Sequence, residues 1–135
     1  MRILTSKQEE FCTYSGIAGI LITSATIIQH FYCYQVFAHP VPAIMLAFLV
    51  CNLSGFIAIS RQLSFAPLLL IISTSLCLFN AAMSLAGPLF SLLAILHFVY
   101  AATITVVAYI DGLPQHLRAR RMALLAEQDE WQGKI

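Results

Sequence analysis

The sequence predicts an all-α membrane protein, with four transmembrane helices in an up-down bundle and a short cytoplasmic C-terminal helix. Hydrophobic residues make up 60% of the 135 residues and charged residues only 10%, against about 45–50% and about 25% in an average soluble domain. Between Phe11 and Ile110 the only charged residue is Arg61. This composition excludes a water-soluble globular domain, a disordered chain and a nucleic-acid-binding protein with a basic face.

The first predicted span covers residues 11–32. A charged segment precedes it, as in a secretory signal peptide, but the apolar run is too long for a signal peptide and ends at no small-residue cleavage site. We therefore expect the segment to be retained as a membrane helix. Aromatic residues gather near its end, among them Phe31 and Tyr32, and such residues are typical of the boundary between membrane and water.

The other three spans follow from helix-breaking residues. The second covers residues 41–60, after Pro40 and before a polar turn at 60–64. The uncharged run from Phe65 to Ile110 would measure about 69 Å as one helix, about twice the membrane thickness. Gly87-Pro88 is a typical turn sequence, so it divides this run into spans 65–86 and 88–110. Residues 1–110 thus form one predicted transmembrane domain.

Residues 111–135 form the predicted charged helical tail. Asp111-Gly112-Leu113-Pro114 ends the fourth span, and a charged helix is expected over 116–131. Its early residues include a basic cluster of Arg118, Arg120 and Arg121. This helix has three possible environments, which are the membrane surface with the arginines at the headgroups, a partner protein, or water.

The basic residues predict the orientation of the bundle. Four up-down spans place the N-terminus, the turn at 60–64 and the tail on one side of the membrane. All seven basic residues fall on that side: Arg2, Lys7, Arg61, Arg118, Arg120, Arg121 and Lys134. The positive-inside rule then predicts that both termini are cytoplasmic. The short loops favour a bacterial inner membrane, and an organelle membrane is the alternative.

Three polar residues within the spans are candidate site residues: Asn52, Asn80 and His97. Counted from the outer ends of their spans at 1.5 Å per residue, they lie about 16, 9 and 13 Å deep, within one slab of the outer half of the membrane. One interpretation is that they hydrogen-bond between helices and fix the packing. The other is a small polar pocket, open to the outer face, that binds an unidentified ligand. A catalytic role for His97 is less supported, because the spans contain no carboxylate to orient it.

Small residues on the first span form the second candidate group. Ser15, Gly19 and Thr23 are spaced four apart, and Gly16 lies beside them. Such residues let helix backbones approach closely in lipid. We expect them either to pack within the bundle or to form a stripe that docks on a neighbouring subunit.

No motif for a metal, a cofactor or a catalytic set is found. His30 lies roughly 13 Å nearer the outer surface than His97, too far for one haem to join them. The spans also contain no carboxylate or arginine of the kind that marks coupled transport.

The leading hypothesis is a non-catalytic small membrane subunit or accessory factor that assembles with other integral membrane subunits in a larger complex. One alternative is a small-molecule binding or transport protein acting through Asn52, Asn80 and His97. A second is an immunity or regulatory protein that blocks a partner in the bilayer, with specificity in residues 34–42. An enzyme is the least supported class. The expected surroundings are the lipid bilayer and other membrane subunits, with no nucleic acid.

Overall fold

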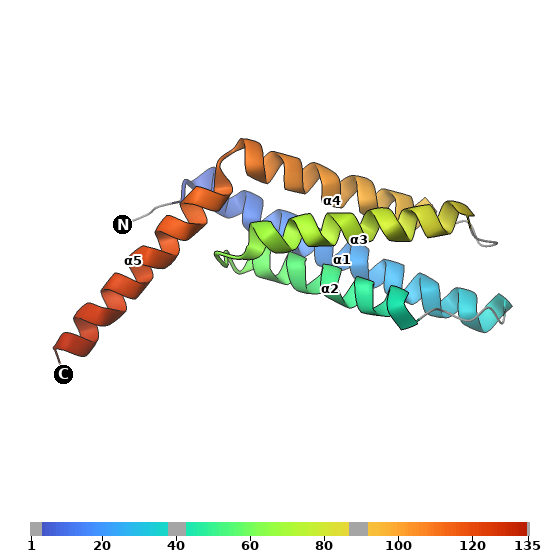
Figure 1. Ribbon diagram of the computed structural model, residues 1–135, viewed down its shortest axis with the longest axis horizontal. Coiled ribbons are helices and arrows are strands. Elements are labelled where there is room, and N and C mark those ends of the chain that lie inside the picture. Colours follow the sequence, from blue (N-terminus) through green and yellow to red (C-terminus); the bar gives the residue numbers. More distant parts are fainter. Residues whose placement is uncertain (1–3, 38–42, 87–91, 135) are drawn as a thin grey trace.

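The computed structural model describes the backbone of residues 4–37, 43–86 and 92–134, and the side chains of residues 4–32, 46–86 and 92–134. Within these residues the elements are five helices and no strand: α1 (Ser6–Phe37), α2 (Ala43–Ser60), α3 (Ala66–Ala86), α4 (Leu92–Ile110) and α5 (Leu113–Gly133). Helices α1 to α4 run up and down side by side, and α5 leaves one end of this bundle obliquely (Figure 1). The predicted turns at Pro40–Pro42 and Gly87–Pro88 lie outside the described residues.

Three helices are long and apolar enough to cross a membrane. They are Ser6–Tyr32 within α1, Ala66–Ala86 and Leu92–Ile110. The described side chains of α2 form a shorter apolar helix, Leu46–Ser60. The chain is therefore a helical membrane protein with three candidate spans, and the fourth span stays a prediction.

Helices α2 and α4 end at Ser60 and Ile110, as the charge and turn signals predict, and the described part of α3 reaches Ala86. Helix α1 departs from the prediction at both limits. It is helical as far as Phe37, five residues past the predicted end of the first span, and it begins at Ser6, five residues before the predicted start. The N–H of Thr5 donates to Gln8 Oε1 at 3.1 Å and the N–H of Gln8 donates to Thr5 Oγ1 at 3.2 Å. This reciprocal capping box satisfies the first amides of the helix and lets it include the charged segment.

Helices α1 and α2 approach almost backbone to backbone. A Cβ atom added at Gly16 would lie 2.5 Å from Ser60 Cβ and 2.8 Å from Ser60 Cα. A Cβ atom added at Gly19 would overlap the ring of Phe56, which is fully buried. Only glycine permits this separation, because any larger residue would push the helices apart.

Helices α3 and α4 are joined by threonine hydroxyls. Thr74 Oγ1 lies 2.8 Å from Thr105 Oγ1 and 3.2 Å from the carbonyl oxygen of Ala101. Ala101 is fully buried at this crossing. These contacts fix the register of α3 against α4, so they also set which residues of the two helices share a level.

The start of α5 closes the end of the bundle at which α1 begins and α2 meets α3. Leu113 and Leu117 are buried there. The side-chain amide of Gln8 donates to the carbonyl of Asp111 at 3.5 Å. Gly112, with φ 70°, turns the chain sharply between α4 and α5, in a conformation that glycine adopts readily.

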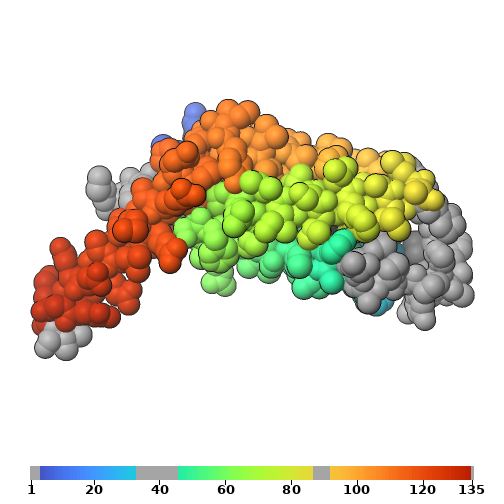
Figure 2. Space-filling view, viewed as in Figure 1, coloured from blue at the N-terminus to red at the C-terminus, as the bar shows by residue number. Residues whose placement is uncertain are grey.

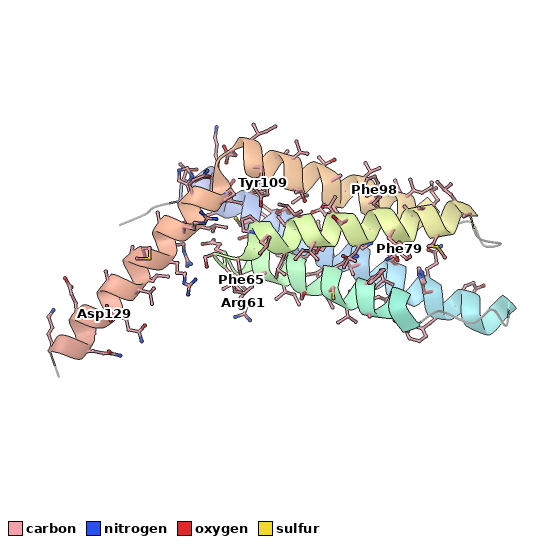
Figure 3. The ribbon with its side chains drawn as sticks, in the orientation of Figure 1. Arg61, Phe65, Phe79, Phe98, Tyr109 and Asp129 are labelled. Atoms are coloured by element: carbon pink, nitrogen blue, oxygen red, sulfur yellow. The ribbon has the colours of Figure 1, made fainter. Side chains whose placement is uncertain are left out.

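Two arginines complete the contact between α5 and the bundle. Arg120 Nη1 donates to the carbonyl of Gln62 at 3.5 Å, and Arg121 Nη1 donates to Ser64 Oγ at 3.4 Å. Arg61 and Phe65 lie at this same end of the bundle (Figure 3). Beyond Arg121 every described residue of α5 is exposed, and Figure 2 shows this part as an arm that extends away from the bundle.

Candidate functional site

The three predicted polar site residues all lie inside the bundle. Asn52 of α2, Asn80 of α3 and His97 of α4 are 0%, 2% and 1% exposed. On α2, Asn52 shares the inward face with Leu49 and Phe56, which are also fully buried. Spacings of three, four and seven residues return to one side of a helix, so this face is continuous.

His97 has a buried partner on α1. Its Nε2 atom lies 3.0 Å from Oγ1 of Thr23, which is itself fully buried. Which of the two atoms donates depends on the tautomer of the imidazole. The ring of Phe56 packs against the same imidazole, with centroids 6.1 Å apart. Helices α1, α2 and α4 therefore meet at His97.

The packing of α1 on α2 places Asn52 at nearly the same height along the bundle axis as Thr23 and His97. Phe56 lies against Gly19, and α1 and α2 are antiparallel (Figure 1). Asn52 is four residues before Phe56 and Thr23 is four residues after Gly19, so both lie about one turn farther along the bundle.

Asn80 reaches a similar level from the other side of the bundle. Thr74 faces Ala101 and Thr105, so Asn80, six residues later on α3, lies opposite the part of α4 that contains His97. Within about one helical turn, 5.4 Å, the bundle therefore contains a polar layer made of Thr23, Asn52, Asn80 and His97.

The asparagines of the polar layer differ from His97 in having no partner among the described residues. There, neither Nδ2 nor Oδ1 of Asn52 makes a hydrogen bond, and the same holds for Asn80. A buried polar group without a partner destabilises a fold by about 1–3 kcal/mol. The sequence predicts hydrogen bonds between helices from Asn52, Asn80 and His97. Within the described residues, only His97 makes such a bond.

The predicted small-residue group on α1 is directed into the bundle. Ser15, Gly16, Gly19 and Thr23 are all buried. Gly16 and Gly19 face α2 and Thr23 faces His97, as described above, while the carbonyl of Ser15 accepts a hydrogen bond from the hydroxyl of Tyr100. These four residues pack helices within the chain, so their face is not available to a neighbouring subunit.

A different set of small residues faces outward. Ala47, Cys51 and Ser54 of α2 are exposed and, at spacings of four and three, lie on one side of the helix, here called the α2 outer face. Ser54 Oγ donates to the carbonyl of Cys51 at 2.6 Å, so its hydroxyl is satisfied within the helix. The spacing of these residues is visible in the sequence, but only the packing shows that they face outward.

The basic cluster divides between two roles. Arg120 and Arg121 contact the turn between α2 and α3 through their guanidinium groups. Arg118 is exposed on the surface of α5. Among the residues that the structure describes, no group of three or more His, Cys, Asp or Glu side chains is placed to hold a metal ion.

The chain matches no family model, no curated protein and no solved structure.

Proposed function

We propose that this chain is a non-catalytic, four-span integral membrane protein that acts as an accessory subunit of a larger membrane protein complex. In this proposal α2 is the remaining span, both termini are cytoplasmic and the membrane is the bacterial inner membrane. The observation that carries the proposal is the α2 outer face.

The α2 outer face suits contact with a helix of another membrane subunit. Within lipid there is little hydrophobic gain when helices associate, so close van der Waals packing decides whether they do, and small residues permit it. The small residues of α1, from Ser15 to Thr23, are buried inside the bundle. Ala47, Cys51 and Ser54 are exposed and are covered by no part of the described chain.

Leucine substitutions on this face test the proposal. The double variant Ala47→Leu, Ser54→Leu fills the face without adding charge. The control is Ala82→Leu, which changes an exposed small residue of α3. After purification from native membranes in a mild detergent, the wild type and the control should retain the same partner subunit, and the double variant should lose it. Retention by the double variant, or a wild type that is a stable monomer, contradicts the proposal.

The exposed thiol of Cys51 offers a second measurement. The chain has four cysteines, of which Cys12 and Cys77 are buried. In a Cys33→Ser background, a thiol-reactive photocrosslinker placed on Cys51 should therefore join the chain to the neighbouring subunit. Cys51→Ser should remove that adduct. An adduct that persists in Cys51→Ser would show that the label reports another position.

The proposed orientation rests on the charges at the end of the bundle closed by α5. Lys7, Arg61 and the three arginines of α5 gather there, and the positive-inside rule assigns such an end to the cytoplasm. We expect a reporter that works only in the cytoplasm to be active when it is fused after Ile135. Activity of a reporter that requires the periplasm would reverse the orientation.

A second candidate function is the binding of a small molecule in the polar layer. The four unpartnered amide atoms of Asn52 and Asn80 favour it, because a ligand with hydrogen-bond donors and acceptors would satisfy them. Asn52→Leu combined with His97→Leu should abolish binding or transport while the helical fold survives. If the double change alters stability alone, this candidate is rejected.

A further inference from the structure

One apolar stripe of α5 continues beyond the bundle. Leu113, Leu117, Leu124 and Trp131, here called the α5 stripe, are spaced four, seven and seven residues apart, and this spacing places them on one side of a helix. Leu113 and Leu117 are 0% and 1% exposed against the end of the bundle, whereas Leu124 and Trp131 are 49% and 65% exposed. The face that packs on the bundle is therefore the face that continues uncovered along the arm.

This face of α5 is directed toward the membrane. Arg120 and Arg121 flank the stripe and reach the turn between α2 and α3, so the stripe is turned toward the end of the bundle. When the bundle crosses a membrane, the lipid headgroups surround that end. Past the edge of the bundle, Leu124 and Trp131 consequently face headgroups instead of protein.

The charges of α5 are arranged to suit an anionic surface. Arg120 and Arg121 lie near the bundle and flank the stripe, and the acidic residues follow them along the helix. At 100° per residue, Asp129 and Glu130 are turned away from the α5 stripe, as is Arg118, and Asp129 lies near the far end of α5 (Figure 3). Glu127 is the exception among the acidic residues, because it lies close to the edge of the stripe.

We propose that α5 is an interfacial helix that binds the headgroups of anionic phospholipids. Arg120 and Arg121 pair with lipid phosphates, to which guanidinium groups bind in a planar, bidentate manner. Leu124 and Trp131 enter the boundary between headgroups and acyl chains, where tryptophan is enriched in membrane proteins. Asp129 and Glu130 remain in water on the opposite side.

The only tryptophan of the chain makes this proposal directly measurable. Trp131 is the single tryptophan, so fluorescence excited selectively in tryptophan, and not in the five tyrosines, reports on α5 alone. We expect its emission to move to shorter wavelength in vesicles of phosphatidylcholine with phosphatidylglycerol, compared with phosphatidylcholine alone. Brominated acyl chains should then quench it more and acrylamide less. High salt should reduce the difference, because it screens charges at the surface.

Variants separate lipid binding from the docking of α5 on the bundle. The double variant Arg120→Gln, Arg121→Gln should remove the difference between the two lipid compositions. Because both arginines also contact the bundle, Leu124→Ser provides an independent test. It touches only the exposed part of the stripe and should reduce quenching by brominated lipid. The control Met122→Ser, on the opposite side of α5 and 65% exposed, should behave as the wild type.

A substitution of Glu127 should strengthen lipid binding, whereas the substitutions above weaken it. Its carboxylate lies beside the stripe and repels anionic headgroups, so Glu127→Gln should increase the shift and the quenching. Two results would overturn the proposal. One is a Trp131 emission that is the same in both kinds of vesicle. The other is a shift that disappears when the protein is diluted within the vesicles, which would show that α5 pairs with a second copy of the chain.

Discussion

The imidazole Nε2 of His97 lies 3.0 Å from the hydroxyl of Thr23, a residue 74 positions earlier in the chain. Both side chains are buried, so neither has water as an alternative partner. The bond therefore holds α4 against α1 at the level where Phe56 of α2 also packs.

Removing the hydroxyl of Thr23 should destabilise the bundle. Thr23→Val keeps the shape of the side chain but leaves His97 without its partner, and we expect a loss of about 1–2 kcal/mol in the free energy of unfolding. Circular dichroism during titration of mixed micelles with a denaturing detergent measures it. Thr103→Val is the control, because Thr103 is exposed and donates only to Val99 of its own helix. Equal losses in both variants would contradict a special role for the pair.

Enlarging Gly19 should separate α1 from α2. The added methyl of Gly19→Ala overlaps the ring of Phe56, and overpacking of this kind lowers the free energy of unfolding by about 1–3 kcal/mol. Gly133→Ala, where a Cβ has no neighbour within 4 Å, should have no such effect. Phe56→Leu in the Gly19→Ala background should recover part of the loss. No recovery would show that the ring is not the obstacle.

Substitutions in the polar layer should change the free energy of unfolding in opposite directions. Asn52→Leu and Asn80→Leu each remove two unpartnered polar atoms, so each should raise the free energy of unfolding by about 1 kcal/mol. His97→Leu, in contrast, breaks the bond to Thr23 and should lower it. The same detergent titration compares the three variants. A loss of stability in the asparagine variants equal to that of His97→Leu would show that the amides are bonded in the membrane.

Loosening the first turns of α5 should expose its arginines to protease. Leu117 is buried against the bundle, and replacing it by serine removes roughly 2 kcal/mol of apolar burial. Trypsin cleavage after Arg118, Arg120 and Arg121 should then accelerate roughly tenfold or more, because cleavage requires local opening. Met122→Ser leaves the docked face intact and should be cleaved at the rate of the wild type. Equal rates would mean that Leu117 does not hold α5.

Charges and turn residues in the sequence predict the ends of α2 and α4 at Ser60 and Ile110, since a charged or helix-breaking residue is costly in lipid. The limits of α1 do not follow from such signals, because it begins at Ser6 and is helical as far as Phe37. Its start depends on two hydrogen bonds between Thr5 and Gln8. Hydropathy contains no information on such a bond, so it places the charged segment outside the helix.

Which side of each helix faces inward was beyond sequence reasoning. In a soluble helix, polar residues mark the outer face, but lipid is as apolar as a protein core, so both faces of α1 and α2 look alike. The small residues of α1 turned out to be internal and those of the α2 outer face external. Asn52, Asn80 and His97 are recognisable in the sequence because polar groups are unfavourable in lipid. The pairing of His97 with Thr23, and that of Thr74 with Thr105, depends on the relative rotation of helices.

The bond between Gln8 and the carbonyl of Asp111 joins residues 103 positions apart, and it has a consequence for biosynthesis. Helix α1 leaves the ribosome before the other four helices, and its glycines meet α2 soon afterward. The partners of Gln8 Nε2 and of the Thr23 hydroxyl lie on α4 and at the start of α5, so they are synthesised later. Helices α1 and α2 can therefore associate while translation continues, whereas the bundle closes only when α4 and the start of α5 have been made.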